Sequence, residues 1–186
     1  MTEWLYRHRG VTAVPLAVAL VWGARPTAVS LGVGLLLVLA FEALRVASLR
    51  YAGVHTRGRS LRAPHLATGG PYARMRHPLY LGNAGVCAGL LLASRAGWPW
   101  FPVLVAGAFL MQYALFIRHE ERFLAATFGP DWNDYAAAVP AVGWTSGLHP
   151  RTPPVLSLAE ALRVEFPTLR TLLVLSLLVA LRPLWP

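Results

Sequence analysis

The chain has 186 residues, of which 56% are apolar and 13% are charged, whereas soluble domains carry about 25% charged residues. The net charge of +9 comes from 17 arginines and no lysine, and these arginines flank long apolar blocks. This pattern indicates a membrane protein whose basic segments face anionic lipid, and it argues against nucleic acid as a partner. The single cysteine, Cys87, excludes a disulfide framework and a CxxC zinc site.

Five apolar segments follow one another along the chain, and each is a predicted membrane helix. They cover residues 11–22, 28–49, 79–94, 98–117 and 169–184. The predicted fold is therefore an all-α integral membrane protein with about five transmembrane helices. The first two segments predict an N-terminal hairpin within residues 1–50. Residues 51–186 are predicted to form the functional core, which also contains a short amphipathic helix over residues 157–166 capped by Ser157.

The distribution of arginine predicts the orientation. If the amino terminus is cytoplasmic, 14 of the 17 arginines lie in cytoplasmic regions or helix ends, and Arg25, Arg95 and Arg182 lie outside. Such a bias is typical of the positive-inside rule. Both long polar regions, 50–78 and 118–168, then lie on the cytoplasmic side. A site built from them would be open to a soluble cofactor.

One candidate motif is the stretch from Thr68 to Gly82, which reads TGGPYARMRHPLYLG. Pro78 fits the first turn of the third membrane helix, where its missing N–H is not needed. The free N–H groups and positive dipole at this helix end, near His77 and Tyr80, would suit an anionic group such as a carboxylate. The alternative is a plain helix start with an arginine anchor and an interfacial tyrosine.

A second candidate cluster, Arg118-His119-Glu120-Glu121, follows the fourth apolar segment. Adjacent carboxylates would attract a cationic ligand. Gln112, Phe116 and Glu120 recur every four residues, so they share one helix face that could line a pocket. The alternative is a solvated helix end in which arginines pair with the glutamates. Glu42 and Arg45, charged residues near the end of the second segment, either pair with each other or face a substrate cavity.

Together these motifs resemble the isoprenylcysteine carboxyl methyltransferase and phospholipid methyltransferase superfamily. The resemblance rests on Gly-Pro-Tyr, Arg-His-Pro-x-Tyr, two membrane segments, Glu-Glu and Phe-Gly in this order over about residues 64–140. It implies an enzyme that transfers a methyl group from S-adenosylmethionine, leaving S-adenosylhomocysteine, to a lipid or prenylated small molecule. It also implies a cytoplasmic-side cofactor pocket that is not a Rossmann site, and the sequence contains no GxGxxG.

The resemblance also implies which residues form the site. Those expected to contact the cofactor are Pro64, His65, Leu66, Ala67, Tyr72, Arg76, His77, Pro78, Leu79, Tyr80 and Glu120. Arg118 and Glu121 are the candidate catalytic residues, and no metal site is expected. The sequence differs from prenylcysteine enzymes at Phe116, where they carry a substrate-binding arginine, and at Trp132, which replaces the first tyrosine of their Phe-Gly-x-x-Tyr-x-x-Tyr pattern.

The acceptor is left open by the sequence. A carboxylate needs no base, whereas an amine or phenol must lose a proton, with His77, His119 or a glutamate assisting. Two other functions compete: a reductase using NADPH and related to sterol reductases, and a membrane protein without catalytic activity. The expected location is the bacterial inner membrane, surrounded by membrane lipids, and the oligomeric state is left open.

Overall fold

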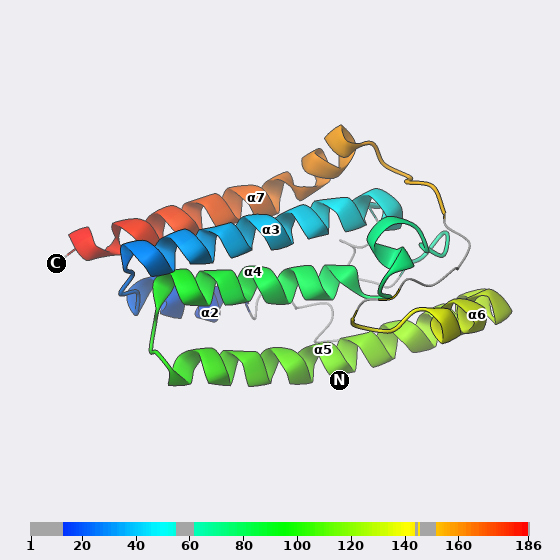
Figure 1. The fold of residues 1–186 in the computed structure, drawn as a ribbon, viewed down its shortest axis with the longest axis horizontal. Coiled ribbons are helices and arrows are strands. Elements are labelled where there is room, and N and C mark those ends of the chain that lie inside the picture. The colour runs from blue at the N-terminus through cyan, green and yellow to red at the C-terminus, as the bar shows by residue number, and fades with distance from the viewer. Residues whose placement is uncertain (1–12, 55–61, 144, 146–151, 186) are drawn as a thin grey trace.

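The computed structural model describes residues 13–54, 62–143, 145 and 152–185. Over these residues the chain is helical and contains no strand. The six α-helices are α2 (Ala13–Trp22), α3 (Ala28–Ala52), α4 (Pro78–Ser94), α5 (Trp100–Phe128), α6 (Pro130–Ala138) and α7 (Leu158–Leu181), with short 3-10 helices η2 (Gly70–Ala73) and η3 (Arg182–Leu184). Figure 1 shows α3, α4, α5 and α7 running roughly alongside one another, with α6 continuing beyond the end of α5.

Three segments of the described chain are long and apolar enough to cross a membrane: Ala28–Ala52, Trp100–Phe128 and Leu158–Leu184. The prediction of about five spans is therefore confirmed for three helices. The 17 residues of α4 rise about 26 Å, close to the bilayer core, whereas the 10 described residues of α2 rise only about 15 Å. The all-helical prediction is confirmed for the described residues, and three of their helices are candidate membrane spans.

Two element boundaries differ from the prediction. The amphipathic helix and the last apolar segment are one helix, α7, because Pro167 removes a single N–H without ending the helix. Ser157 does cap this helix, in a capping box with Glu160. Similarly, α5 continues to Phe128 because good helix formers follow the apolar segment. The cluster at 118–121 thus lies within α5 and not beyond its end.

Helices α3 and α4 pack most closely, because glycines let their backbones approach. A Cβ added to Gly34 would lie 2.5 Å from the Ala93 nitrogen, and one added to Gly89 would lie 2.7 Å from the Gly34 carbonyl oxygen. Phe41 similarly fills the space in front of Gly85. Small residues at a helix interface are typical of membrane helix pairs, where van der Waals packing replaces the hydrophobic effect.

The turn between α2 and α3 and the turn between α4 and α5 lie at one end of the bundle, which we call the turn end (Figure 1). The amide of Arg25 donates to the Ser94 carbonyl at 2.7 Å, and the Arg182 side chain approaches the Trp22 carbonyl at 3.4 Å. Arg25, Arg182 and Arg95, the C-cap of α4, are the three arginines predicted to lie outside. The opposite end, which we call the site end, carries residues 62–77 and α6 (Figure 1).

Candidate functional site

The segment that enters α4 is held by a tight approach to α3. Gly70 has a φ of +56°, which glycine adopts readily, and a Cβ there would lie 2.2 Å from the Tyr51 ring. The next residues form η2 and bury Tyr72. Pro78 then begins α4, and no side chain caps this helix end at His77. Tyr72, His77 and the start of α4 therefore lie close together at the site end.

Arg76 joins this segment to α5 and to the end of α6. Its Nε and Nη2 donate to the Glu121 carboxylate at 2.9 and 2.7 Å. Its Nη1 donates to the carbonyls of Ala136 and Val139 at 2.8 and 2.6 Å, and its guanidinium lies 5.7 Å from the centre of the Trp132 ring. Because these carbonyls belong to the end of α6, one side chain fixes three parts of the chain relative to one another.

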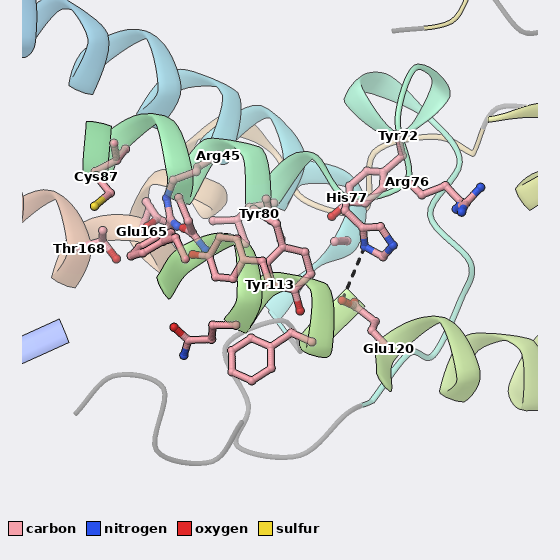
Figure 2. Close-up of a pocket in the computed structure, with 18 of the residues that line it drawn as sticks. Arg45, Tyr72, Arg76, His77, Tyr80, Cys87, Tyr113, Glu120, Glu165 and Thr168 are labelled. Atoms are coloured by element: carbon pink, nitrogen blue, oxygen red, sulfur yellow. Dashed lines mark hydrogen bonds and ion pairs between the residues drawn. The ribbon is translucent and has the colours of Figure 1, made fainter. Parts of the chain in front are cut away.

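His77 lies between two glutamates of α5. Its Nε2 is 3.1 Å from Glu121 Oε1, and its Nδ1 is 3.8 Å from Glu120 Oε2 (Figure 2). The His77 side chain is 3% exposed, whereas those of Glu120 and Glu121 are 31% and 27% exposed. Because Arg76 and His77 already engage Glu121, Glu120 is the member of this group with a carboxylate available to a ligand.

Two buried tyrosines close the site from the side of α6. The Tyr135 hydroxyl donates to the Tyr72 carbonyl at 2.8 Å. Burial, with a smaller contribution from the Glu120 carboxylate and then Tyr135, holds the pKa of Tyr72 well above its usual value of 10. Burial also raises the pKa of Tyr135. Both phenols therefore stay neutral at physiological pH and act as hydrogen-bonding and packing groups.

These side chains open onto a cavity of about 820 Å³ that runs between α2, α3, α4, α5 and α7. Its polar part, at the site end, is lined by Arg62, His65, Tyr72, Arg76, His77, Glu120, Trp132 and Tyr135. Its apolar part, toward the turn end, is lined by Leu16, Leu20, Val86, Leu90, Leu172 and Leu175. The volume lies within the range of small-molecule and cofactor sites. The cavity can hold a polar molecule at one end and an apolar one at the other.

Most of the residues expected from the sequence lie on the wall of this cavity. They are His65, Leu66, Ala67, Tyr72, Arg76, His77, Leu79, Tyr80 and Glu120. Four expected residues are not part of the wall. Pro64 and Arg118 are exposed, and Pro78 is buried at the start of α4. Glu121 binds Arg76 and His77 and does not line the cavity. The predicted stripe of Gln112, Phe116 and Glu120 does line the cavity.

Among the wall residues that sequence reasoning missed is a buried acidic one, Glu165 of α7. Its carboxylate meets the Arg45 guanidinium at 2.5 Å, and Arg45 also lies 3.0 Å from Glu42. The sequence left open whether Arg45 pairs with Glu42 or faces a cavity. Arg45 does both, because it lines the cavity while paired. Glu165 looked like part of an exposed polar helix face because it lies between residues typical of an amphipathic helix. Only the contact with α3 distinguishes it.

Within the described residues, no group of three or more His, Cys, Asp or Glu side chains is arranged to hold a metal ion. His65 instead contacts the Tyr51 carbonyl oxygen at 2.8 Å. Two further histidines, His55 and His149, lie outside the described residues.

The fold and the site together define a helical membrane protein with a cavity that is polar at one end and apolar at the other. The chain belongs to the phospholipid methyltransferase family, whose model matches residues 28–131. This match covers more than half of the chain and includes α3, α4, α5 and the segment that carries His77. The protein is therefore a methyltransferase-family membrane protein, and the resemblance inferred from the motifs is confirmed.

Two curated relatives are similar over a shorter region. The cobalt-zinc-cadmium resistance protein CzcN of Cupriavidus metallidurans is 41% identical over 78 residues, which cover 41% of this chain and 34% of that protein. The nickel-cobalt-cadmium resistance protein NccN of Alcaligenes xylosoxydans xylosoxydans is 35% identical over 80 residues, which cover 43% of this chain and 36% of that protein. The match thus spans about a third of each relative. No solved structure matches the chain.

Proposed function

We propose that the protein transfers a methyl group from S-adenosylmethionine to a lipid-like acceptor within the membrane. One observation carries the proposal. His77 precedes α4 and Glu120 belongs to α5, yet their side chains lie 3.8 Å apart on the wall of one cavity, and the far part of that cavity is apolar. A site of this form could bring a polar donor and an apolar acceptor together, and the family match supports this function.

The described residues fit such a donor. S-adenosylmethionine supplies an electrophilic methyl group on a positively charged sulfonium. The partly accessible Glu120 carboxylate complements a cation, and the start of α4 near Leu79 complements a carboxylate through the helix dipole. Tyr80 and Tyr113, whose ring centres are 5.0 Å apart, offer aromatic faces toward positive charge.

The remaining site residues act by positioning. Arg76 and Glu121 fix His77 and the end of α6 around the polar part of the cavity. Buried Tyr72 and Tyr135 exclude water from its side wall. Holding the reactants in line in a dry site supplies much of the rate of a methyl transfer. Arg118 is exposed and off the cavity wall, so the mechanism gives it no contact with the substrate.

The proposed location is the bacterial inner membrane, with the amino terminus and the site end in the cytoplasm. Three helices long enough to cross, the bacterial origin of the relatives and the grouping of Arg25, Arg95 and Arg182 at the turn end support it. In this topology α2 and α4 also cross the membrane, which makes five crossings. The donor then reaches the cavity from the cytoplasm and the acceptor from the bilayer.

The decisive experiment is transfer of labelled methyl groups from S-adenosylmethionine into a bacterial lipid extract by the purified protein, followed by identification of the labelled lipid. Thermal stabilisation by S-adenosylhomocysteine should accompany it. Stabilisation by NADPH instead would support the reductase, and stabilisation by neither, with no labelled lipid, would support a non-catalytic protein.

Glu120→Gln tests the site directly. Loss of a charged hydrogen-bond partner should weaken S-adenosylhomocysteine binding about 10- to 100-fold, as measured by calorimetry, without lowering the melting temperature. Asp131→Asn removes an exposed carboxylate of α6 that lies outside the cavity lining, and serves as the matched control. Equal affinity in the two variants would argue against this site.

A further inference from the structure

A buried group of three charged side chains lies on the cavity between its polar and apolar parts. Arg45 of α3 contacts Glu42 one turn earlier and Glu165 of α7. All three belong to the long apolar helices that form candidate membrane spans. Charged residues at such depth are rare and usually mark a substrate or ion path. The mechanism described above does not use them.

Arg45 and Glu165 both line the cavity, and Arg45 is the accessible member of the group. The Arg45 side chain is 15% exposed, whereas Glu42 is 5% and Glu165 is 0% exposed. Both oxygens of Glu42, Oε2 of Glu165 and Nε of Arg45 have almost no accessible surface. The two buried carboxylates thus hold Arg45, whose side chain lies beside Glu165 on the cavity wall (Figure 2).

The position along the cavity suits an acceptor. The stem of Arg45 packs against Gly82, where a Cβ would lie 2.5 Å from its Cγ. Gly82 is five residues beyond His77, or about 7 Å along α4. Other uncharged polar side chains line the cavity beside these elements, namely Asn83, Gln112 and Thr168. Beyond them the lining is apolar, so Arg45 lies between the proposed donor site and the space for an apolar tail.

We infer that Arg45 is the residue that binds the reacting oxygen of the acceptor, and that the reaction is O-methylation of an apolar chain ending in a carboxylate, phenol or enol. This inference rests on the proposed methyl transfer. A guanidinium donates hydrogen bonds and accepts none, so it complements an oxygen or oxyanion. An alkylammonium group would instead meet a like charge, with the oxygens of Glu42 and Glu165 turned away from it.

The chemistry balances without a further reactant. The acceptor enters as its anion, or its hydroxyl first releases a proton to water, with Arg45 stabilising the oxyanion. The oxygen then forms the new bond to the methyl carbon as the sulfur–methyl bond breaks, and the electron pair of that bond stays on sulfur. The charges of oxyanion and sulfonium cancel. The oxygen of the neutral ether or ester accepts a weaker hydrogen bond from Arg45 than the oxyanion does, and this favours release of the product.

The test uses the full chain in detergent with three probes of equal chain length: dodecanoic acid, para-dodecylphenol and dodecylamine. The variant is the triple substitution Glu42→Gln, Arg45→Gln and Glu165→Gln, because three amides keep neutral hydrogen-bonding side chains in place of the buried charged group and leave no unpaired buried carboxylate. Arg163→Gln, an exposed arginine of the same helix α7, is the control. Stabilisation by S-adenosylhomocysteine and the melting temperature show whether each protein is folded and its donor site intact.

We expect the wild type and Arg163→Gln to methylate the acid or the phenol and to be stabilised by it. The triple variant should keep its response to S-adenosylhomocysteine but lose about 10- to 100-fold in kcat/KM and in affinity for the oxygen probe. Methylation of dodecylamine in preference to both oxygen probes, or full activity in the triple variant, would overturn the inference. A wild type that does not respond to S-adenosylhomocysteine would instead contradict the proposed function.

Discussion

Arg76 shows how much of the site depends on one side chain. The sequence suggested that it contacts the cofactor, and it does line the cavity. Its donors, however, are used on the Glu121 carboxylate and on the carbonyls of Ala136 and Val139. These partners lie 45 to 63 residues away in the chain, and carbonyl acceptors carry no signal in the sequence. The motif revealed the position of Arg76 but could not reveal this bracing role.

Arg76→Lys should therefore damage both stability and the site. Lysine keeps the charge, but it lacks the planar fork that reaches Glu121 and the two carbonyls together. Leaving buried carbonyls unsatisfied costs about 1–3 kcal/mol each, so we expect a lower melting temperature and weaker S-adenosylhomocysteine binding. Arg122→Lys, at an exposed position of α5, should change neither. A thermal scan of the two variants that showed no difference would contradict the bracing role.

At the scale of elements, hydrophobic segments in the sequence located the three described helices that are long enough to cross a membrane, but not where each helix ends. Helix α5 runs past the polar residues that seemed to end it, because those residues are good helix formers. Helix α7 joins the predicted amphipathic helix to the last apolar segment, because Pro167 does not stop it. The wall residue Glu165 was missed because it lies in the predicted amphipathic part. Its burial depends on the approach of α3, and helix pairing cannot be derived from a hydropathy pattern.

The close pairing of α3 and α4 gives a test at this scale. Gly89→Ala places a Cβ 2.7 Å from the Gly34 carbonyl oxygen and 2.8 Å from Val38, so the helices must separate at a cost of about 1–3 kcal/mol. The control is Gly107→Ala in α5, where a Cβ meets nothing within 4 Å and alanine should be neutral or stabilising. Melting temperatures in one detergent compare them. Equal melting temperatures in the two variants would show that the close approach at Gly89 does not contribute to stability.

For the whole molecule, the ends of the helices sort into two groups. Arg25, Arg182 and Arg95 share the turn end, while His77, Glu120 and α6 share the site end (Figure 1). The arginine count predicted this separation before any contact was known, because short loops on one side of a membrane must come together. The cavity itself could not be predicted, since it depends on how the helices tilt and pack.

Cysteine labelling tests the orientation in cells. With Cys87, which is buried and the chain's one cysteine, replaced by serine, a cysteine at Arg95 should react with a membrane-impermeant maleimide added to intact cells with a permeable outer membrane. A cysteine at Asp134, which is exposed on α6, should react only after the inner membrane is opened. The reverse pattern would place the site end in the periplasm, out of reach of a cytoplasmic methyl donor.

Helix α5 buries a single residue, Phe116, among its 29, although Gln112, Phe116 and Glu120 line the cavity. Much of the rest of its surface is exposed in the described structure, and the part that spans the membrane faces the acyl chains of the bilayer. The position of this side of the cavity is therefore set partly by lateral pressure and bilayer thickness. Under the proposed function, the rate of methyl transfer should then differ between membranes of different composition.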